Sequence, residues 1–444
     1  MSTLPPGPRT PQLLQWLSYG LLPYATFTRA AARYGDTYTM RMMGESYVVL
    51  GDPEHVKEVF TGSPDDLYSG EANRPLRSLI GERNVLLLDG PEHLRRRRLV
   101  LPPFHGERMR AYEDVVRDVA RRELASWPQG APLAVLPHMR AITFEVILRA
   151  VFGVDERPRL ASLQQRLDAM LAWLTNLRQG IIFGLLGPER MERQRRFRRE
   201  LAAVDAEVLA HVAQRRADPA LEERADVLSM LLLARDEDGR PLTDQEVRDE
   251  LVTLLTAGHE TTSALLAWAI HDAVRTPGAM DRLAAREDGW AEAVVRESLR
   301  LRPPIPLVVR RLQRPMTIAG LDLPAGATVA PCAVLAHRRA GLYPDPEAFR
   351  PERFLGAAPP TYGWLPFGGG VRRCIGAAFA QMEARLVLEE LAATWLLRPA
   401  SPRPERVGRR GIVIVPARGG RVVVTGRRPA PAPEQAQEPD VAVA

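Results

Sequence analysis

A glycine-rich loop that ends in a cysteine, directly before a helix, is the sequence feature that most restricts the fold of this chain. The loop reads Phe367-Gly368-Gly369-Gly370-Val371-Arg372-Arg373-Cys374-Ile375-Gly376, and a helix is predicted from about Ala377 to Leu396. Glycines let a backbone come close to a flat, bulky group. A helix N-terminus presents free N–H groups and a positive potential, which favour the thiolate form of Cys374. The segment therefore predicts a thiolate that can bind a metal.

Two other interpretations of this loop stay open on these residues alone. A free cysteine is most often a small core hydrophobe. Glycine-rich loops also bind phosphate, although no Lys-Ser/Thr pair follows the glycines here. The chain has only two cysteines, Cys332 and Cys374. We therefore expect no disulfide framework and a reducing cytoplasm as the compartment, and any thiol chemistry must depend on one of the two.

The rest of the sequence predicts a mainly α fold with small β-sheets (α+β). Hydrophobic residues make up 45% of the 444 residues, enough for a large core. From about Pro91 to Leu301, apolar residues recur at helical spacings among strong helix formers. Short strands or ordered loops are predicted at 37–42, at 47–50 and, between proline-rich breaks, from 303 to 367. Segments 411–415 and 421–425 are predicted to form a β-hairpin, and the Pro-, Ala- and Glu-rich tail 429–444 to be disordered.

The basic charge of the chain does not indicate nucleic-acid binding. The net charge is +6, with arginine runs at 95–98 and 193–199. A basic run is usually a solvated helix face, and no nucleic-acid-binding module accompanies it, so an acidic protein partner fits better. In this interpretation Arg95, Arg96, Arg98 and Arg373 are solvated. No secretory signal and no run of about 20 apolar residues occurs, which predicts a cytoplasmic protein without a transmembrane segment.

Polar residues also interrupt an otherwise apolar helix at Leu254-Leu255-Thr256-Ala257-Gly258-His259-Glu260-Thr261-Thr262. Gly258 weakens a helix interior, and threonine hydroxyls can bond back to carbonyls, so a local distortion is expected. The alternative is a helix that turns a polar face to solvent. A further pair, Glu297 and Arg300, lies one helical turn apart, which alone would be ordinary surface decoration.

The loop resembles the haem-binding signature of the cytochromes P450, with matches at Phe367, Gly368, Gly370, Arg372, Cys374 and Gly376. In that family the cysteine thiolate is the fifth iron ligand, and it supplies electron density that favours O–O cleavage. The resemblance covers nearly the whole chain. It implies a single domain at 1–428, with a triangular helical body and haem b (iron protoporphyrin IX) between the long central helix and the helix after the Cys loop.

The resemblance also assigns roles to other residues. Glu297 and Arg300, with Arg353 of Pro351-Glu352-Arg353-Phe354, would form a buried structural ion network. Glu260 and Thr261 would deliver protons for the cleavage of dioxygen. The haem propionates would lie against cations, and the signature residues would surround the ring. The residues implied at the haem are His93, Arg97, Arg310, Arg372, Phe367, Gly368 and Gly376, with Trp364 packing or hydrogen bonding near the same edge.

The implied activity is monooxygenation of a hydrophobic substrate, such as a fatty acid, terpenoid, steroid or polyketide. Electrons would come from a separate ferredoxin- or flavodoxin-type donor and its reductase, and the chain would be a monomer. Two alternatives are a peroxide-driven peroxygenase, against which the Glu260-Thr261 pair argues, and a non-enzymatic haem sensor. By resemblance, pocket walls would come from segments 76–88 and 171–186 and from Leu255, Ala257, Ile305, Val308 and Ile412, which are apolar.

Overall fold

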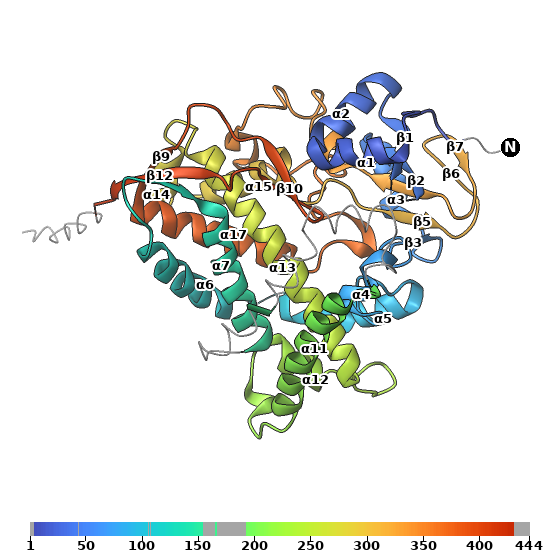
Figure 1. Ribbon diagram of the computed structural model, residues 1–444, viewed down its shortest axis with the longest axis horizontal. Helices are drawn as coiled ribbons and strands as arrows, with labels where there is room; N and C mark the ends of the chain where they lie inside the picture. The colour runs from blue at the N-terminus through green and yellow to red at the C-terminus, as the bar shows by residue number, and fades with distance from the viewer. Residues whose placement is uncertain are drawn as a thin grey trace, which may run out of the picture.

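Helices make up about half of the described structure, and small sheets lie in the upper half of Figure 1. This computed structural model describes residues 4–429 except 43, 105, 107, 154–164 and 167–191; the expected pocket segment 171–186 and the tail from 430 onward lie outside the described residues. The mainly α fold with small sheets is confirmed. The helices are α1 Gln12–Leu21, α2 Pro23–Tyr34, α3 Pro53–Thr61, α4 Arg77–Ile80, α5 Gly90–Val100, α6 Arg108–Ala125, α7 Val135–Ile147, α11 Arg195–Arg216, α12 Val227–Leu233, α13 Asp244–Ala273, α14 Ala279–Ala284, α15 Trp290–Leu301, α16 Ala333–Ala336 and α17 Ala377–Thr394.

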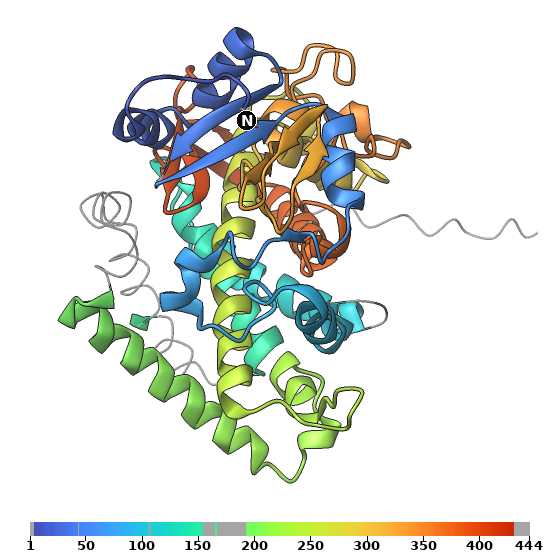
Figure 2. The same ribbon diagram turned by 90° about the vertical axis from the view of Figure 1, so that its right-hand side faces the viewer.

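Helix α13, 30 residues long, passes through the centre of the molecule, as both views show (Figures 1 and 2). Its start is fixed by a capping box, in which Thr243 and Glu246 each accept a hydrogen bond from the other's backbone N–H. The helix is continuous through the polar segment 254–262, so the expected distortion is absent. The Thr256 and Thr261 hydroxyls do bond to carbonyls four residues back, but the helical hydrogen bonds persist around them.

Helix α7 packs closely on the middle of α13. A Cβ at Gly258 would lie 3.0 Å from Ile147 Cδ1, so the glycine permits this approach. The Thr143 hydroxyl donates to the His259 carbonyl at 3.1 Å, and the Phe144 ring meets the buried His259 ring edge-on with centroids 5.2 Å apart. His259 is therefore a core packing residue.

The largest sheet has five strands in the order β1-β2-β8-β5-β3. Strands β1 and β2 match the predicted pair 37–42 and 47–50 and are antiparallel. The proline-rich region supplies β5 and β8, confirming short strands there. The strands are β1 Thr37–Met42, β2 Glu45–Leu50, β3 Leu67–Tyr68, β4 Pro132–Ala134, β5 Arg310–Leu312, β6 Met316–Ile318, β7 Leu321–Leu323, β8 Thr328–Pro331, β9 Trp395–Pro399, β10 Val407–Arg410, β11 Val413–Pro416 and β12 Arg421–Arg427.

The predicted hairpin between 411–415 and 421–425 is wrong. Strand β11 pairs with β10, whereas β12 pairs with β9 and β4. Gly419 and Gly420 have positive φ angles of 80° and 68°, which direct the chain into a different sheet. A Cβ at Gly420 would lie 2.9 Å from the Ala267 carbonyl oxygen of α13, so this turn packs against the central helix.

Candidate functional site

The Cys loop, defined here as residues 367–376, is held by its own backbone. The Cys374 N–H donates to the Phe367 carbonyl at 2.9 Å, and the Arg373 N–H donates to Gly370 at 3.1 Å. Gly368 and Gly370 have φ angles of 65° and 64°, in the left-handed region that side chains rarely adopt. A Cβ added at Gly370 would also clash with the carbonyl oxygen of Phe60. The glycines are therefore needed for both conformation and packing.

We expect Gly370→Ala to destabilise the protein by more than about 1 kcal/mol, because it combines left-handed strain with a clash against Phe60. The measurement is the midpoint of urea unfolding. Gly341→Ala is the matched control, since Gly341 has a negative φ and nothing within 4 Å of an added Cβ. Equal midpoints for the two variants would contradict this account of the loop.

Cys374 has solvent-accessible surface even though protein surrounds it. The cysteine is exposed, yet burial raises the pKa of its thiol, opposed by the Gly376 N–H and by Arg97 and Arg373. We interpret the accessible surface of Cys374 as facing the interior of the protein, which agrees with both its exposure and the effect of burial on its pKa. The predicted effect of the helix N-terminus is present but smaller than the effect of burial. A thiol in this position becomes a thiolate when a metal ion binds it.

Three arginines and one histidine lie together beside the Cys loop, and we call them the cationic cluster: His93, Arg97, Arg310 and Arg372. Burial, then Arg372, Arg97 and Arg310, lowers the pKa of His93 to about 3. Burial and then Arg372, opposed by Asp89, lower the pKa of Arg310 to about 10. The carboxylate of Asp89 pairs with Arg372, but it also accepts backbone N–H groups of residues 69–71. Cations exceed anions here, so the cluster is suited to bind anionic groups.

One face of α13 is accessible although most of the helix is buried. Ala257 is exposed, and Gly258 and Thr261 are partly so, in contrast to the buried His259 and Glu260 between them. The Thr261 hydroxyl donates to the Ala257 carbonyl at 2.7 Å. Its oxygen lone pairs remain free to accept a hydrogen bond.

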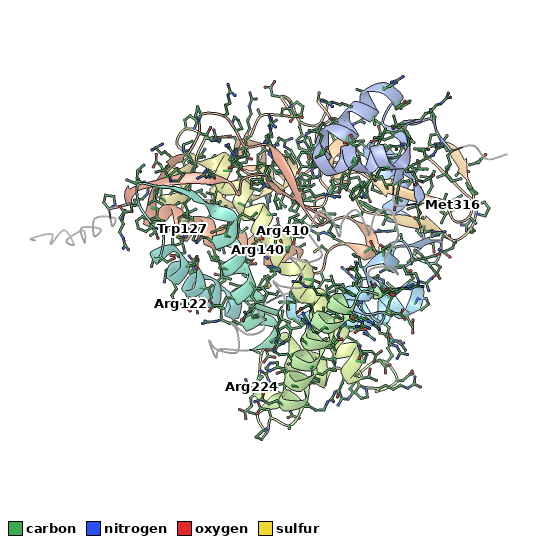
Figure 3. All side chains as sticks on the ribbon, viewed as in Figure 1. Arg122, Trp127, Arg140, Arg224, Met316 and Arg410 are labelled. Carbon is green, nitrogen blue, oxygen red and sulfur yellow. The ribbon has the colours of Figure 1, made fainter. Side chains whose placement is uncertain are left out.

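Glu260 points away from this face into an ion cluster. Its Oε1 lies 2.9 Å from Arg140 Nη2 of α7 and 3.3 Å from Arg410 Nε of β10; Figure 3 shows the two arginines side by side at the centre of the molecule. Burial alone would raise the pKa of Glu260, but His259, Arg140 and Arg410 lower it to about 2. Glu260 is therefore an ionised carboxylate at neutral pH, whereas the neighbouring Thr261 presents a neutral hydroxyl.

The sequence matches the cytochrome P450 family over residues 4–286 and 290–419. The chain belongs to the cytochrome P450 family. Among its relatives, a putative cytochrome P450 135B1 of Mycobacterium tuberculosis is 40% identical over 98% of this chain and 94% of the relative. A putative cytochrome P450 137 of the same species is 40% identical over 89% of this chain and 84% of the relative.

Solved structures agree on the fold of this P450. The heme domain of cytochrome P450DA has a TM-score of 0.80 at 25% identity and covers 97% of this chain and 99% of its own. A retinoic-acid-bound cyanobacterial CYP120A1 has a TM-score of 0.82 at 22% identity, covering 96% and 100%. The enzyme is a haem-thiolate monooxygenase that uses dioxygen, an organic substrate and redox partners.

The predicted ion network of the P450 is present and buried. Arg300 Nε and Nη2 lie 2.7 and 2.8 Å from the two carboxylate oxygens of Glu297, and both side chains have no exposed surface. Arg353 Nε lies 3.5 Å from Glu297 Oε1. Arg300 also donates to three carbonyls, those of His337, Pro346 and Ala348. The network ties α15 to the loop before the Cys loop.

His337 was not found from the sequence, although it joins this network to Leu365, two residues before the Cys loop. Burial lowers its pKa to about 3, so the ring is neutral. Its Nδ1 lies 3.0 Å from the Arg300 carbonyl and its Nε2 accepts the Leu365 N–H at 2.8 Å. Trp364 also bonds here: its Nε1 donates to the Arg296 carbonyl at 3.2 Å, which places its polar contact on α15.

The predicted substrate-pocket residues are only partly brought together. Leu255 is 1% exposed and packs in the main hydrophobic core, so its assignment to the pocket wall is wrong: it faces away from Ala257 on the same helix. Ile305 and Val308 are half-buried, and Ile412 is 57% exposed at the β10–β11 turn.

Arg96 is also corrected. It is buried and paired with Glu246 and Glu250 of α13 at 2.6 and 3.2 Å, so it is not solvated as predicted. Arg140 and Arg410 were likewise missed, because nothing in their local sequence marks them as partners of Glu260. Within the described ranges, no helix is both long and apolar enough for a membrane span.

Proposed function

We propose that this P450 holds haem b through the thiolate of Cys374 and hydroxylates hydrophobic organic molecules in the cytoplasm, as a monomer that receives electrons from a ferredoxin- or flavodoxin-type donor and its reductase. The observation that carries the proposal is the accessible thiol of Cys374 beside the cationic cluster. When bound, haem supplies the iron at which dioxygen is activated, and a thiolate ligand favours O–O cleavage.

The residues fit the two propionates of haem. Among the described residues, Asp89 pairs with Arg372 and lies near Arg310, so two further anions would balance the charge of Arg97, Arg310 and Arg372. His93 is kept neutral by burial and by its arginine neighbours, and it can donate a hydrogen bond without adding charge. A Cβ at Gly376 would meet nothing within 4 Å, which leaves room for a flat group beside the signature.

Thr261 and Glu260 take different parts in proton delivery in this proposal. Thr261 Oγ1 is accessible and bonds to Ala257, so it can accept a hydrogen bond from a water and stabilise the water beside dioxygen. Glu260 is ionised, and its Oε2 has no hydrogen-bond partner within the described part of the chain. That oxygen can orient a water molecule, while Arg140 and Arg410 fix the carboxylate.

We expect Thr261→Ala to lower the amount of product formed per NAD(P)H consumed about 100-fold. The reason is that a positioned proton-transfer group accelerates a reaction on the order of 10²-fold or more. The measurement compares product formed with NAD(P)H consumed. Thr256→Ala is the matched control: its hydroxyl makes the same type of bond, to the Val252 carbonyl at 2.7 Å, five residues earlier on α13. If both variants form the same amount of product per NAD(P)H consumed, Thr261 has no special role in proton delivery.

The activity itself is tested with surrogate ferredoxin and reductase and a panel of fatty acids, terpenoids, steroids and polyketides. Substrates are first selected by the change in haem spin state that they cause, then tested for oxidised products. NAD(P)H-dependent product formation is expected. Turnover only with hydrogen peroxide would indicate a peroxygenase instead, and ligand binding without any product would indicate a sensor.

A further inference from the structure

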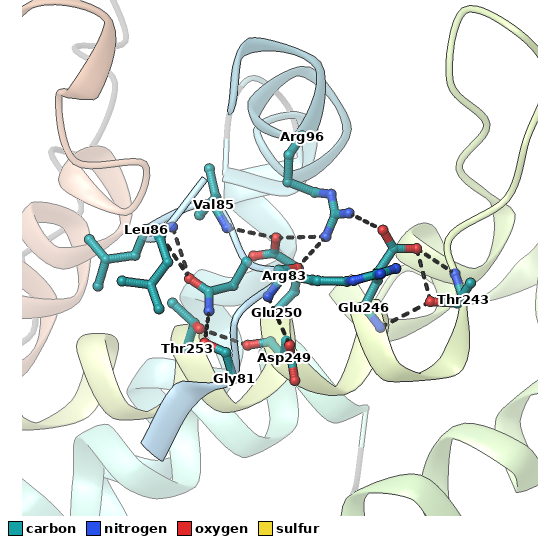
Figure 4. Close-up of polar contacts among 12 residues, drawn as sticks. Gly81, Arg83, Val85, Leu86, Arg96, Thr243, Glu246, Asp249, Glu250 and Thr253 are labelled. Carbon is teal, nitrogen blue, oxygen red and sulfur yellow. Dashed lines mark hydrogen bonds and ion pairs between the residues drawn. The ribbon is translucent and has the colours of Figure 1, made fainter. Parts of the chain in front are cut away.

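The first turns of α13 hold a loop that leads to the cationic cluster. We call residues 81–88, between α4 and α5, the strap. Two carboxylates of α13 bind its backbone: Asp249 Oδ2 accepts the Arg83 N–H at 3.0 Å, and Glu250 Oε1 accepts the Val85 N–H at 2.8 Å (Figure 4). Gly81 has a φ of 80° and lies directly against the Asp249 carboxylate, with no room for a side chain. The strap is therefore packed tightly on the central helix.

The peptide groups of Val85 connect α13 to the Cys loop. The N–H of Val85 donates to Glu250, and the carbonyl of Val85 accepts a hydrogen bond from Arg372 Nη1 at 3.2 Å. Arg372 lies two residues before Cys374 and also bonds to Leu88 at the end of the strap and to Asp89 directly after it. A change in the strength of the hydrogen bond between Glu250 and the Val85 N–H is thus transmitted, through Val85 alone, to Arg372 of the cationic cluster.

The strap is stiff between these contacts. Asn84 is fully buried, and its side chain donates to the carbonyls of Ile80 and Gly81 while accepting the N–H groups of Leu86 and Leu87. The side chain thus closes the turn on both sides of Val85. A rigid turn passes displacement from one end to the other, whereas a loose loop would absorb it.

The charges around Glu250 leave it without a cation of its own. Arg96 of α5 lies 2.6 Å from Glu246 and 3.2 Å from Glu250, so two carboxylates share one guanidinium. Asp249 is paired with Arg248 at 3.0 Å. The strap side chains Glu82 and Arg83 are exposed. One ionised glutamate suffices to balance the charge of Arg96, and the more exposed Glu246 is that counterion.

The burial of Glu250 agrees with this charge count. The residue has no exposed surface, and its Oε2 has no hydrogen-bond partner among the residues described. Burial raises the pKa of Glu250 to about 8, against the lowering effects of Arg96 and of the Val85 N–H. At neutral pH the carboxyl is therefore mostly protonated, and it ionises in mildly alkaline solution, where its hydrogen bond with Val85 becomes charge-assisted and stronger.

We propose that Glu250 is a positioning residue, which through Val85 and Arg372 adjusts the electrostatic environment of the haem according to whether its carboxyl carries a proton. The proposal rests on the proposed haem site. It predicts a proton-linked change in haem properties that originates outside the haem pocket, at the N-terminal end of the central helix.

The test is a pH titration of the ferric holoenzyme from about pH 6 to pH 9.5, following the Soret spectrum and the reduction potential. We expect a one-proton step near pH 8 in the wild type. Glu250→Gln, which keeps the shape but cannot ionise, removes the step. Glu246→Gln is the matched control: Glu246 contacts the same Arg96 but not the strap, so this variant keeps a step, moved to lower pH because Glu250 is then the one carboxylate paired with Arg96. A step that persists in Glu250→Gln, or its absence from the wild type, overturns the proposal.

A second variant covers the case in which Glu250→Gln does not fold. Arg96→Met removes the cation that lowers the pKa of Glu250, so the step moves to higher pH by about one unit or more. An unmoved step in Arg96→Met also overturns the proposal. Failure of the proposed function would look different: the reduced wild-type protein would then lack the thiolate-type carbon monoxide spectrum at every pH.

Discussion

Cys374→Ala is expected to abolish the red-shifted thiolate band in the carbon monoxide difference spectrum of the reduced protein, and with it NAD(P)H-dependent turnover. The physical reason is that Cys374 is the accessible thiol at the end of the Cys loop, whereas Cys332 is fully buried. Alanine keeps the backbone bonds of the loop, including the Cys374 N–H to Phe367. The variant therefore tests the sulfur atom separately from the loop.

Cys332→Ala is the control for this experiment. Burial raises the pKa of the Cys332 thiol to about 12, and its side chain packs in the core between the first sheet and α2, so it stays a neutral core residue. We expect the Cys332 variant to lose some stability but to keep the thiolate band. If the band survives in Cys374→Ala, or disappears in Cys332→Ala alone, the assignment of the ligand is incorrect.

The Cys loop could be predicted because its constraints are local. Gly368 and Gly370 adopt conformations that few other residues tolerate, and the helix that follows begins at Ala377 as predicted. The end of that helix was placed two residues late, because Trp395 and Leu396 are compatible with either a helix or the strand β9 that they form. Whether such residues form a helix or a strand is decided by their sheet partner, β12.

Contacts between distant segments could not be predicted in this way. The hairpin prediction failed because the pairing of β11 depends on β10, and the continuous apolar runs of β11 and β12 do not identify the partner strand. Arg96 was assigned to solvent because its arginine run looks uniformly polar. In the structure, Arg96 alone of the four is buried, because Glu246 and Glu250 approach it from α13.

The same limit applies to Glu260. Its place next to Thr261 in the sequence suggested a shared part in proton delivery, yet adjacent residues on a helix point about 100° apart. Glu260 faces Arg140 and Arg410, which come from α7 and β10, 120 and 150 residues away. The sequence motif identified both residues, but only the fold shows that an ion cluster keeps Glu260 ionised.

Glu297→Gln is expected to be the most destabilising of the conservative substitutions considered for this enzyme, with a loss of about 3–5 kcal/mol in the free energy of unfolding. Loss of one partner leaves Arg300 charged and buried without a counterion, which is the costly case for a buried ion pair. The three carbonyls that Arg300 also contacts cannot neutralise it. The measurement is chemical unfolding, together with the yield of folded, haem-containing protein.

Glu352→Gln is the matched control, because it makes the same chemical change in the neighbouring Pro351-Glu352-Arg353-Phe354 segment. Glu352 is largely exposed, and its pair with Arg282 at 3.2 Å lies on the surface, so a change of at most about 1 kcal/mol is expected. Similar losses for the two variants would mean that the Glu297–Arg300 pair is no more important than a surface pair. A large loss confined to Glu297→Gln would instead place the stability of the Cys loop partly in α15, since His337 joins Arg300 to Leu365 just before that loop.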